Sequence, residues 1–229
     1  MYRKPIIIVG TGHIADIVHY YLIKSCTPVE AFAVSEKYIE TESYRGVPVV
    51  PFETVEKRFS PSDFSMFVAI GYKQLNHLRA KFFYAAKEKG YSLISYVDPK
   101  ANVSPSVTIG DNVFIFEGNN IQFNASIGDN TILWSGNHVG HETRIGKHVY
   151  IASHVVVSGF CDIGDYCFMG VNSAVADEVT IGANCLIAMG ANVVHDMPPE
   201  KVCAPPRSSF IEYDKLSVDA RSMFDPRCI

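Results

Sequence analysis

The stretch LWSGNHVGHETRIG, Leu133 to Gly146, carries both the period and the reactive side chains of this chain. His138 and His141 stand three residues apart, and Glu142 directly follows the second histidine. Such a trio suits a zinc site, an acid–base pair or the polar side of a structural repeat. The period of the surrounding sequence decides which of these roles is open.

A period of six residues runs from Val97 to Val193. All 17 positions on this period are aliphatic or methionine, where a chain that is 48% hydrophobic would give about eight apolar positions. The residue after each is often small, and the residue two before it is small or β-branched. This pattern is typical of a hexapeptide repeat, in which three short parallel strands form each turn of a triangular coil. Because nothing interrupts the register, we expect about five turns without an excursion loop.

The cysteines and prolines fit this coil. Cys161, Cys167 and Cys185 fall on its small inward positions, so we expect them to pack rather than to react. The six cysteines lack CxxC spacing, which favours reduced thiols over a disulfide framework or a zinc ribbon. After Val193 the pattern fails in HDMPPEKVCAPPRSSF, where the prolines are expected to end the stack.

Strands and helices alternate in the first part of the chain. PIIIVG (5–10), VEAFAVS (29–35) and FSMFVAIG (64–71) are predicted strands, and GHIADIVHYYLIKS (12–25) and KQLNHLRAKFFYAAKEKG (73–90) are predicted helices. This alternation indicates a parallel, doubly wound sheet. We therefore predict an α/β Rossmann-like domain over residues 1–96, an all-β parallel β-helix over 97–198 and a C-terminal tail over 199–229.

Composition excludes several classes of partner. The formal charge of −4, with acidic and basic residues interspersed, gives no electrostatic footprint for nucleic acid or an anionic membrane. The N-terminal apolar run is too short for a signal peptide, and no window approaches the length of a membrane span. We expect a cytoplasmic protein.

The six-residue period also predicts which residues share a corner of the coil. Residues 18 apart stand one above another, which puts His141 in an outward column with Phe123, Gly159, Asp177 and His195. Glu142 occupies the adjacent column. His141 and Glu142 are thus expected side by side on the surface, with a glycine directly above the histidine.

A doubly wound unit followed by an unbroken coil carrying GHETRIG resembles the NeuD/PglD-type bacterial sugar acyltransferases, from IIIVGTGHIADIV to CAPPRS. The resemblance implies a left-handed β-helix and a homotrimer with its active site between subunits. It also implies acetyl-CoA-dependent acetylation, without a metal, of the amino group of a nucleotide-linked deoxyamino sugar in surface glycan biosynthesis. Two stretches depart from the family pattern, since WSG (134–136) replaces Asn-Thr-Gly and CAPPR (203–207) replaces Gly-Asn-Pro-Ala.

The same resemblance assigns roles to residues. His141 is the expected general base, Glu142 supports it, and the backbone amide of Gly159 contacts the thioester carbonyl. Coenzyme A is expected at Gly159, Asp177, Ala188 and Arg207. The nucleotide sugar is expected at Gly10, Gly12, His13, Ser35, Glu36, Gly71, Tyr72, Trp134 and His138.

Several alternatives stay open at this point. His138 could line the pocket or cap a turn, and His148 and His154 are expected to be solvated or at a subunit contact. A zinc site needs three converging ligands. GTGHIAD followed by Glu36 would suit NAD, but no hydride-acceptor site follows it. Tyr72, Lys73, Asn76 and Arg79 could contact the nucleotide or solvate a helix face.

The sequence leaves two alternative functions open and predicts a surface between subunits. The chain could acetylate a sugar hydroxyl, or it could be a non-catalytic trimer that binds a nucleotide sugar. Apolar residues outside the inward register predict a surface between subunits. These residues are Phe114, Phe116, Phe123 and Trp134.

Overall fold

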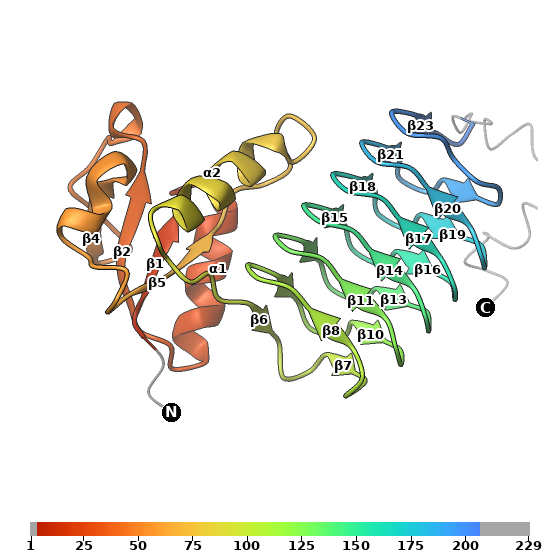
Figure 1. Ribbon diagram of the computed structural model, residues 1–229, viewed down its shortest axis with the longest axis horizontal. Helices are drawn as coiled ribbons and strands as arrows, with labels where there is room; N and C mark the ends of the chain where they lie inside the picture. The colour runs from red at the N-terminus through yellow and green to blue at the C-terminus, as the bar shows by residue number, and fades with distance from the viewer. Residues whose placement is uncertain (1–3, 207–229) are drawn as a thin grey trace, which may run out of the picture.

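The computed structural model describes residues 4–206, which form an N-terminal α/β domain and a β-helix placed end to end (Figure 1). The elements of the first domain are β1 (Ile6–Val9), α1 (His13–Lys24), β2 (Val29–Val34), η1 (Glu36–Tyr38), β3 (Ser43–Tyr44), β4 (Val47–Pro51), η2 (Phe52–Lys57), β5 (Ser65–Val68) and α2 (His77–Glu88).

The predicted doubly wound sheet is confirmed, with one addition. The strand order is β3-β4-β2-β1-β5, and every pair is parallel except β3 with β4. Ile6 and Ile8 of β1 pack with α1, whereas Ile7 and Val9 pack with α2 on the opposite face. Both helices bury one apolar side against a strand that is buried on both faces, as parallel sheets require.

The second helix starts later than its apolar pattern suggests. The prediction from Lys73 is wrong, because Gln74, Leu75 and Asn76 all have positive φ and the helix begins at His77. Its end agrees with the sequence, since Gly90 follows with a φ of +87°, the left-handed conformation that stops a helix.

The six-residue period is confirmed from β6 to β22. Each of these two-residue strands ends on a position of the period, and from Val103 onward that residue packs in the core. The strands are β6 (Tyr96–Val97), β7 (Asn102–Val103), β8 (Thr108–Ile109), β9 (Phe114–Ile115), β10 (Asn120–Ile121), β11 (Ser126–Ile127), β12 (Ile132–Leu133), β13 (His138–Val139), β14 (Arg144–Ile145), β15 (Tyr150–Ile151), β16 (Val156–Val157), β17 (Asp162–Ile163), β18 (Phe168–Met169), β19 (Ala174–Val175), β20 (Thr180–Ile181), β21 (Leu186–Ile187), β22 (Asn192–Val193) and β23 (Val202–Cys203).

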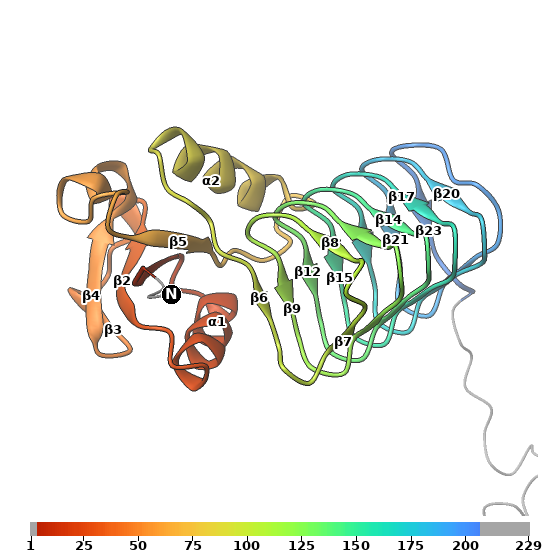
Figure 2. The same cartoon turned by 60° about the horizontal axis from the view of Figure 1, so that its bottom comes forward.

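Strands of successive turns pair in parallel and make three flat sides (Figure 2). The three inward cysteines are buried, and burial raises the pKa of the Cys167 thiol to about 12, which fits packing rather than reactivity. The prediction that the prolines end the stack is wrong. The register shortens by two residues between Val193 and Met197, which pairs with Ile181, and β23 then pairs with β21 inside the segment predicted as a tail.

The first residue of each strand faces outward and gives each side its own chemistry. The side formed by β6, β9, β12, β15, β18, β21 and β23 is called the aromatic side here, that of β8, β11, β14, β17 and β20 the polar side, and that of β7, β10, β13, β16, β19 and β22 the mixed side. Their outward rows are Tyr96, Phe114, Ile132, Tyr150, Phe168 and Leu186; Thr108, Ser126, Arg144, Asp162 and Thr180; and Asn102, Asn120, His138, Val156, Ala174 and Asn192.

The N-terminal domain covers the aromatic side. Phe114 and Phe116 are 1% and 4% exposed and pack with Tyr21 of α1, and Trp134 stacks on Phe116. These three residues were predicted to face another subunit. That prediction is wrong for Phe114 and Phe116, because the chain's own first domain supplies their partner; Phe123 stays 53% exposed.

Helix α2 is anchored on the neighbouring corner by a buried arginine. The Arg79 guanidinium donates to the carbonyl oxygens of Asn130, His148 and Val149 at 3.0–3.1 Å. It also donates to Gly71 O and Asn76 Oδ1. Burial without a carboxylate lowers the pKa of Arg79 to about 9. Neither helix among the described residues is long and apolar enough to cross a membrane.

Candidate active site

His141 lies at the corner between β13 on the mixed side and β14 on the polar side. Its ring stacks on Phe123, with 5.4 Å between centroids and 14° between planes. The Phe160 ring lies nearly perpendicular to the imidazole, with 4.8 Å between centroids. A Cβ added to Gly159 would lie 2.8 Å from His141 Cε1 and 3.0 Å from Nε2. The predicted column is therefore confirmed, and the ring fits only because residue 159 is glycine.

Glu142 does not contact the histidine ring. Its backbone is left-handed, with a φ of 56°, and its exposed carboxylate accepts a hydrogen bond from Asn124 Nδ2 at 2.7 Å. His141 Nδ1 is buried and has no hydrogen-bond partner among the described residues. The two side chains thus share a corner, as expected, without forming an ion pair or a hydrogen bond.

The backbone around His141 is fixed by side chains of the neighbouring turns. Gln122 Oε1 accepts from the His141 amide at 3.0 Å, and Asp177 Oδ1 accepts from the Gly159 amide at 2.8 Å. Asp129 and Asp165 accept backbone amides at another corner in the same way. The Gly159 amide, expected at the thioester carbonyl, therefore already has an acceptor in this structure.

The nucleotide-sugar residues predicted in the N-terminal domain all follow the carboxyl ends of strands and lie at one edge of the sheet. This strand-end group consists of Gly10, Gly12 and His13 after β1, Ser35 and Glu36 after β2, and Gly71 and Tyr72 after β5. Gly10 has a φ of +117°, and an added Cβ would lie 3.0 Å from Ala69 O. Gly12 faces open space at the start of α1, where free backbone amides suit a phosphate.

The predicted residues fall into two groups that one chain does not bring together. The strand-end group belongs to the domain that covers the aromatic side, whereas His141 lies at the corner of the other two sides. His138 faces outward on the mixed side, and Asn120 Nδ2 lies 3.3 Å from its Nδ1. Trp134 donates to the Tyr150 hydroxyl on the aromatic side, and Ala188 lies half-buried after β21. Arg207 lies outside the described residues.

A pocket of about 420 Å³ opens beside the strand-end group, away from His141. Tyr72 forms one wall, and its ring contacts Tyr150 and Phe168 at 5.0 Å between centroids. The other lining residues are Leu75, Asn184, Leu186, Glu200, Lys201 and Val202. The pocket lies where the loop after β5 meets the end of the β-helix.

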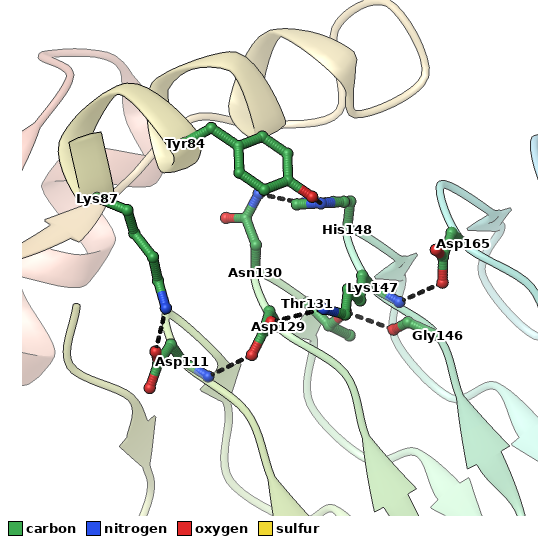
Figure 3. A network of polar contacts seen from close by, with 10 residues as sticks. All are labelled: Tyr84, Lys87, Asp111, Asp129, Asn130, Thr131, Gly146, Lys147, His148 and Asp165. Carbon is green, nitrogen blue, oxygen red and sulfur yellow. Dashed lines mark hydrogen bonds and ion pairs between the residues drawn. The ribbon is translucent and has the colours of Figure 1, made fainter. Parts of the chain in front are cut away.

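Two expectations about polar residues are wrong. Asn76 and Arg79 do not solvate a helix face, because both are fully buried against carbonyl oxygens of the coil, and Arg79 also donates to Gly71 O in the strand-end group. His148 is 1% exposed at the domain junction, where Tyr84 and Asn130 bind its two ring nitrogens (Figure 3). His154, in contrast, is exposed.

Sequence reasoning also missed three contacts at the corner itself. The register of 18 residues placed Asn124 and Phe160 in the column of Glu142, but their contacts with Glu142 and His141, and the bond from the His141 amide to Gln122, were not predicted. Among residues 4–206 no cluster of three or more His, Cys, Asp or Glu side chains could hold a metal ion.

Comparisons with known proteins match the repeat and the overall fold. Residues 124–159 match the bacterial transferase hexapeptide family (six repeats). The chain is similar to the perosamine N-acetyltransferase of Caulobacter crescentus, solved with CoA and GDP-perosamine, at 31% identity. The match covers 88% of this chain and 93% of that one, with a TM-score of 0.79. The chain belongs to the hexapeptide-repeat acetyltransferases.

More distant structures share the fold of this acetyltransferase. The acetyltransferase domain of PglB from Neisseria gonorrhoeae, solved with acetyl coenzyme A, is 23% identical. That match covers 90% of this chain and 100% of that domain, with a TM-score of 0.79. WeeI from Acinetobacter baumannii is 18% identical over 87% of this chain and 96% of its own, with a TM-score of 0.76. No curated protein matches the chain.

Proposed function

We propose that this acetyltransferase transfers the acetyl group of acetyl-CoA to the amino group of a nucleotide-linked deoxyamino sugar for surface glycan biosynthesis. The observation that carries the proposal is the corner of His141, an imidazole with no hydrogen-bond partner among residues 4–206 and with a glycine beside it, in a chain that is 31% identical to a GDP-perosamine N-acetyltransferase. Two structures of that relative have a histidine replaced by asparagine or alanine.

His141 acts as the general base of the reaction. The sugar nitrogen attacks the thioester carbonyl carbon while His141 Nε2 takes a proton from the amine. A C–N bond forms, the carbonyl oxygen becomes an oxyanion, and the C–S bond breaks when the oxyanion collapses. The leaving thiolate of coenzyme A takes the proton from the His141 imidazolium, which regenerates the neutral base and leaves the amide and free CoA as products.

The backbone amide of Gly159 is the donor for the oxyanion, an interaction worth about 3–4 kcal/mol in other acyl transfers. Asp177 holds that amide in the resting enzyme and must turn away when the acyl donor binds. Asp177 is an exposed corner residue, so its carboxylate can be solvated when it releases the amide. Ala188 and Arg207 remain proposed contacts to coenzyme A.

The active site is completed by a second copy of the chain. The strand-end group, which includes Gly10 and Tyr72, is on the other side of the β-helix from His141 of the same chain. A neighbouring copy in a homotrimer must therefore bring its His141 to the strand-end group. Exposed apolar residues flank or occupy the mixed side: Phe123, Val156, Phe160, Val171, Met189 and Val194, each 37–69% exposed. A monomeric mass by light scattering at micromolar concentration would contradict this assembly.

The test is an assay of free thiol release with acetyl-CoA and a panel of nucleotide amino sugars, beginning with GDP-perosamine. We expect turnover with at least one of them and a product that survives mild alkali, as an amide does. An alkali-labile product would identify a sugar O-acetyltransferase. Binding of a nucleotide sugar without thiol release across the panel would identify the non-catalytic trimer.

A further inference from the structure

Within the described part of the chain, the imidazole of His141 packs against two aromatic rings and a glycine backbone and pairs with no charged group. Phe123, His141 and Gly159 come from three successive turns and stack in one column. Phe160 closes one edge of the imidazole. All of these contacts are apolar, which is unusual for a histidine expected to take up a proton.

A counter-ion for the protonated ring is absent from the described surroundings. The neighbouring carboxylate of Glu142 is bound by Asn124, and Asp177 stands two turns of the coil away from His141, beyond Gly159. The imidazolium formed during catalysis therefore faces the π-electrons of Phe123, whose ring is nearly parallel to the imidazole, whereas the nearer ring of Phe160 is perpendicular to it. A cation within about 6 Å of an aromatic centroid is attracted by the negative face of the ring.

The exposure of Phe123 indicates a role beyond packing in one chain. The side chain is 53% exposed and lies outside the core of the β-helix. The equivalent first residues of the corner that faces α2 are polar, namely Asp111, Asp129, Lys147 and Asp165. An exposed phenylalanine at such a position loses the solvation that a polar residue would keep, and its near-parallel stack on His141 is what it gains.

We propose that Phe123 is a positioning residue for the reaction, whose ring orients the His141 imidazole and stabilises the imidazolium. The proposal rests on the proposed function of His141. It assigns to an aromatic face the part that an acidic residue has in a catalytic triad. Glu142 then has at most a secondary effect on the resting enzyme.

The experiment replaces Phe123 by leucine, which keeps an apolar side chain without the π face, and by tryptophan, which restores the face. With acetyl-CoA and GDP-perosamine, F123L should lower kcat by about 3- to 30-fold, the rate equivalent of a cation–π contact, with unchanged KM values. F123W should recover most of the rate. Y38L is the matched control, because Tyr38 is 65% exposed and lies on η1, outside the His141 corner.

A second readout needs no substrate. In an NMR titration of the His141 ring, F123L should move the protonation midpoint to lower pH, because the imidazolium loses its partner; F123W should restore it. An unchanged midpoint, a raised KM at constant kcat, or equal losses in F123L and F123W would overturn the proposal, as would loss of the trimer in F123L. Full activity of H141A would instead overturn the proposed function.

Discussion

Two histidines in neighbouring repeats, His141 and His148, occupy coil corners with opposite surroundings. His141 is half-exposed, and no described residue is hydrogen-bonded to its ring. His148 is buried, with Nδ1 2.8 Å from Asn130 Nδ2 and Nε2 2.9 Å from the Tyr84 hydroxyl. Burial, followed by the Arg79 charge, lowers the pKa of His148 to about 4. The repeat supplies a corner position, and what covers the corner decides whether a histidine can exchange a proton.

The hydrogen bonds at His148 run in one direction. The Val68 amide donates to Asn112 Oδ1, Asn112 Nδ2 donates to Asn130 Oδ1, and Asn130 Nδ2 donates to His148 Nδ1. His148 must then carry its proton on Nε2 and donate it to the Tyr84 oxygen (Figure 3). A second proton on Nδ1 would oppose the Asn130 donor, so His148 is fixed as the neutral form.

The largest contrast between the two corners concerns catalysis. His141→Ala should lower kcat by roughly 10²–10⁴-fold with little change in KM, because a positioned base is lost. Its residual activity should rise with pH as free amine becomes more abundant. His138→Ala, on the same turn but outside the corner, should keep most of the activity. Equal losses in both variants of the acetylation assay would point to a structural pair instead of a base.

Substitutions at the domain junction around His148 should lower the stability of the protein without changing its catalytic chemistry. Arg79→Leu leaves five acceptors without their donor, most of them buried, and should lower the free energy of unfolding by about 2–5 kcal/mol in urea denaturation. Arg144→Leu is the matched control. It removes an exposed ion pair with Asp162, worth about 0–1 kcal/mol. Similar losses for both arginines would show that the junction contributes little to stability.

Acid should weaken the same junction within a defined pH window. The pKa of His148 is about 4 in the folded chain and near 6.5 in the unfolded chain, so the unfolded state binds more protons between these values. Stability should fall by roughly 3 kcal/mol as the pH drops from 6.5 to 4. His148→Asn should flatten this part of the curve, whereas His154→Asn, at an exposed corner, should leave it unchanged. Parallel curves for wild type and H148N would contradict the assignment.

The sequence predicted the fold and the register of the coil better than the contacts of individual side chains. Strict spacing from Val97 to Val193 defined the coil and the column of His141, because a repeat that stacks on itself converts sequence distance into position. The same spacing did not predict what covers the outward-facing residues of the coil. Phe114 and His148 were expected to face solvent or another subunit, and both are covered by the chain's own first domain.

The remaining errors have a local cause. The positive φ values of Gln74 and Leu75, just before Asn76, are not signalled by residue type, and these three residues delay α2. Arg79 resembles a solvated helix residue in sequence, because burying a guanidinium needs a set of carbonyl oxygens that only the packed coil supplies. At the active site, the adjacency of His141 and Glu142 was predictable, but the choice of Asn124 as partner for the carboxylate depends on side-chain rotamers.

The smallest expected effect tests whether Phe123 or Glu142 supports the His141 imidazolium. If Phe123 supports the imidazolium, Glu142→Gln should lower kcat by less than about tenfold, because its carboxylate is bound by Asn124 and not by His141. Asn124→Ala frees the carboxylate and should leave kcat equal or slightly higher. Asn102→Ala breaks the similar exposed bond between Asn102 and Asn120 and is the control for simple loss of a ladder contact. A loss in E142Q as large as that in H141A would mean that Glu142 leaves Asn124 during turnover and pairs with the buried Nδ1 of His141, so that the resting corner differs from the working one.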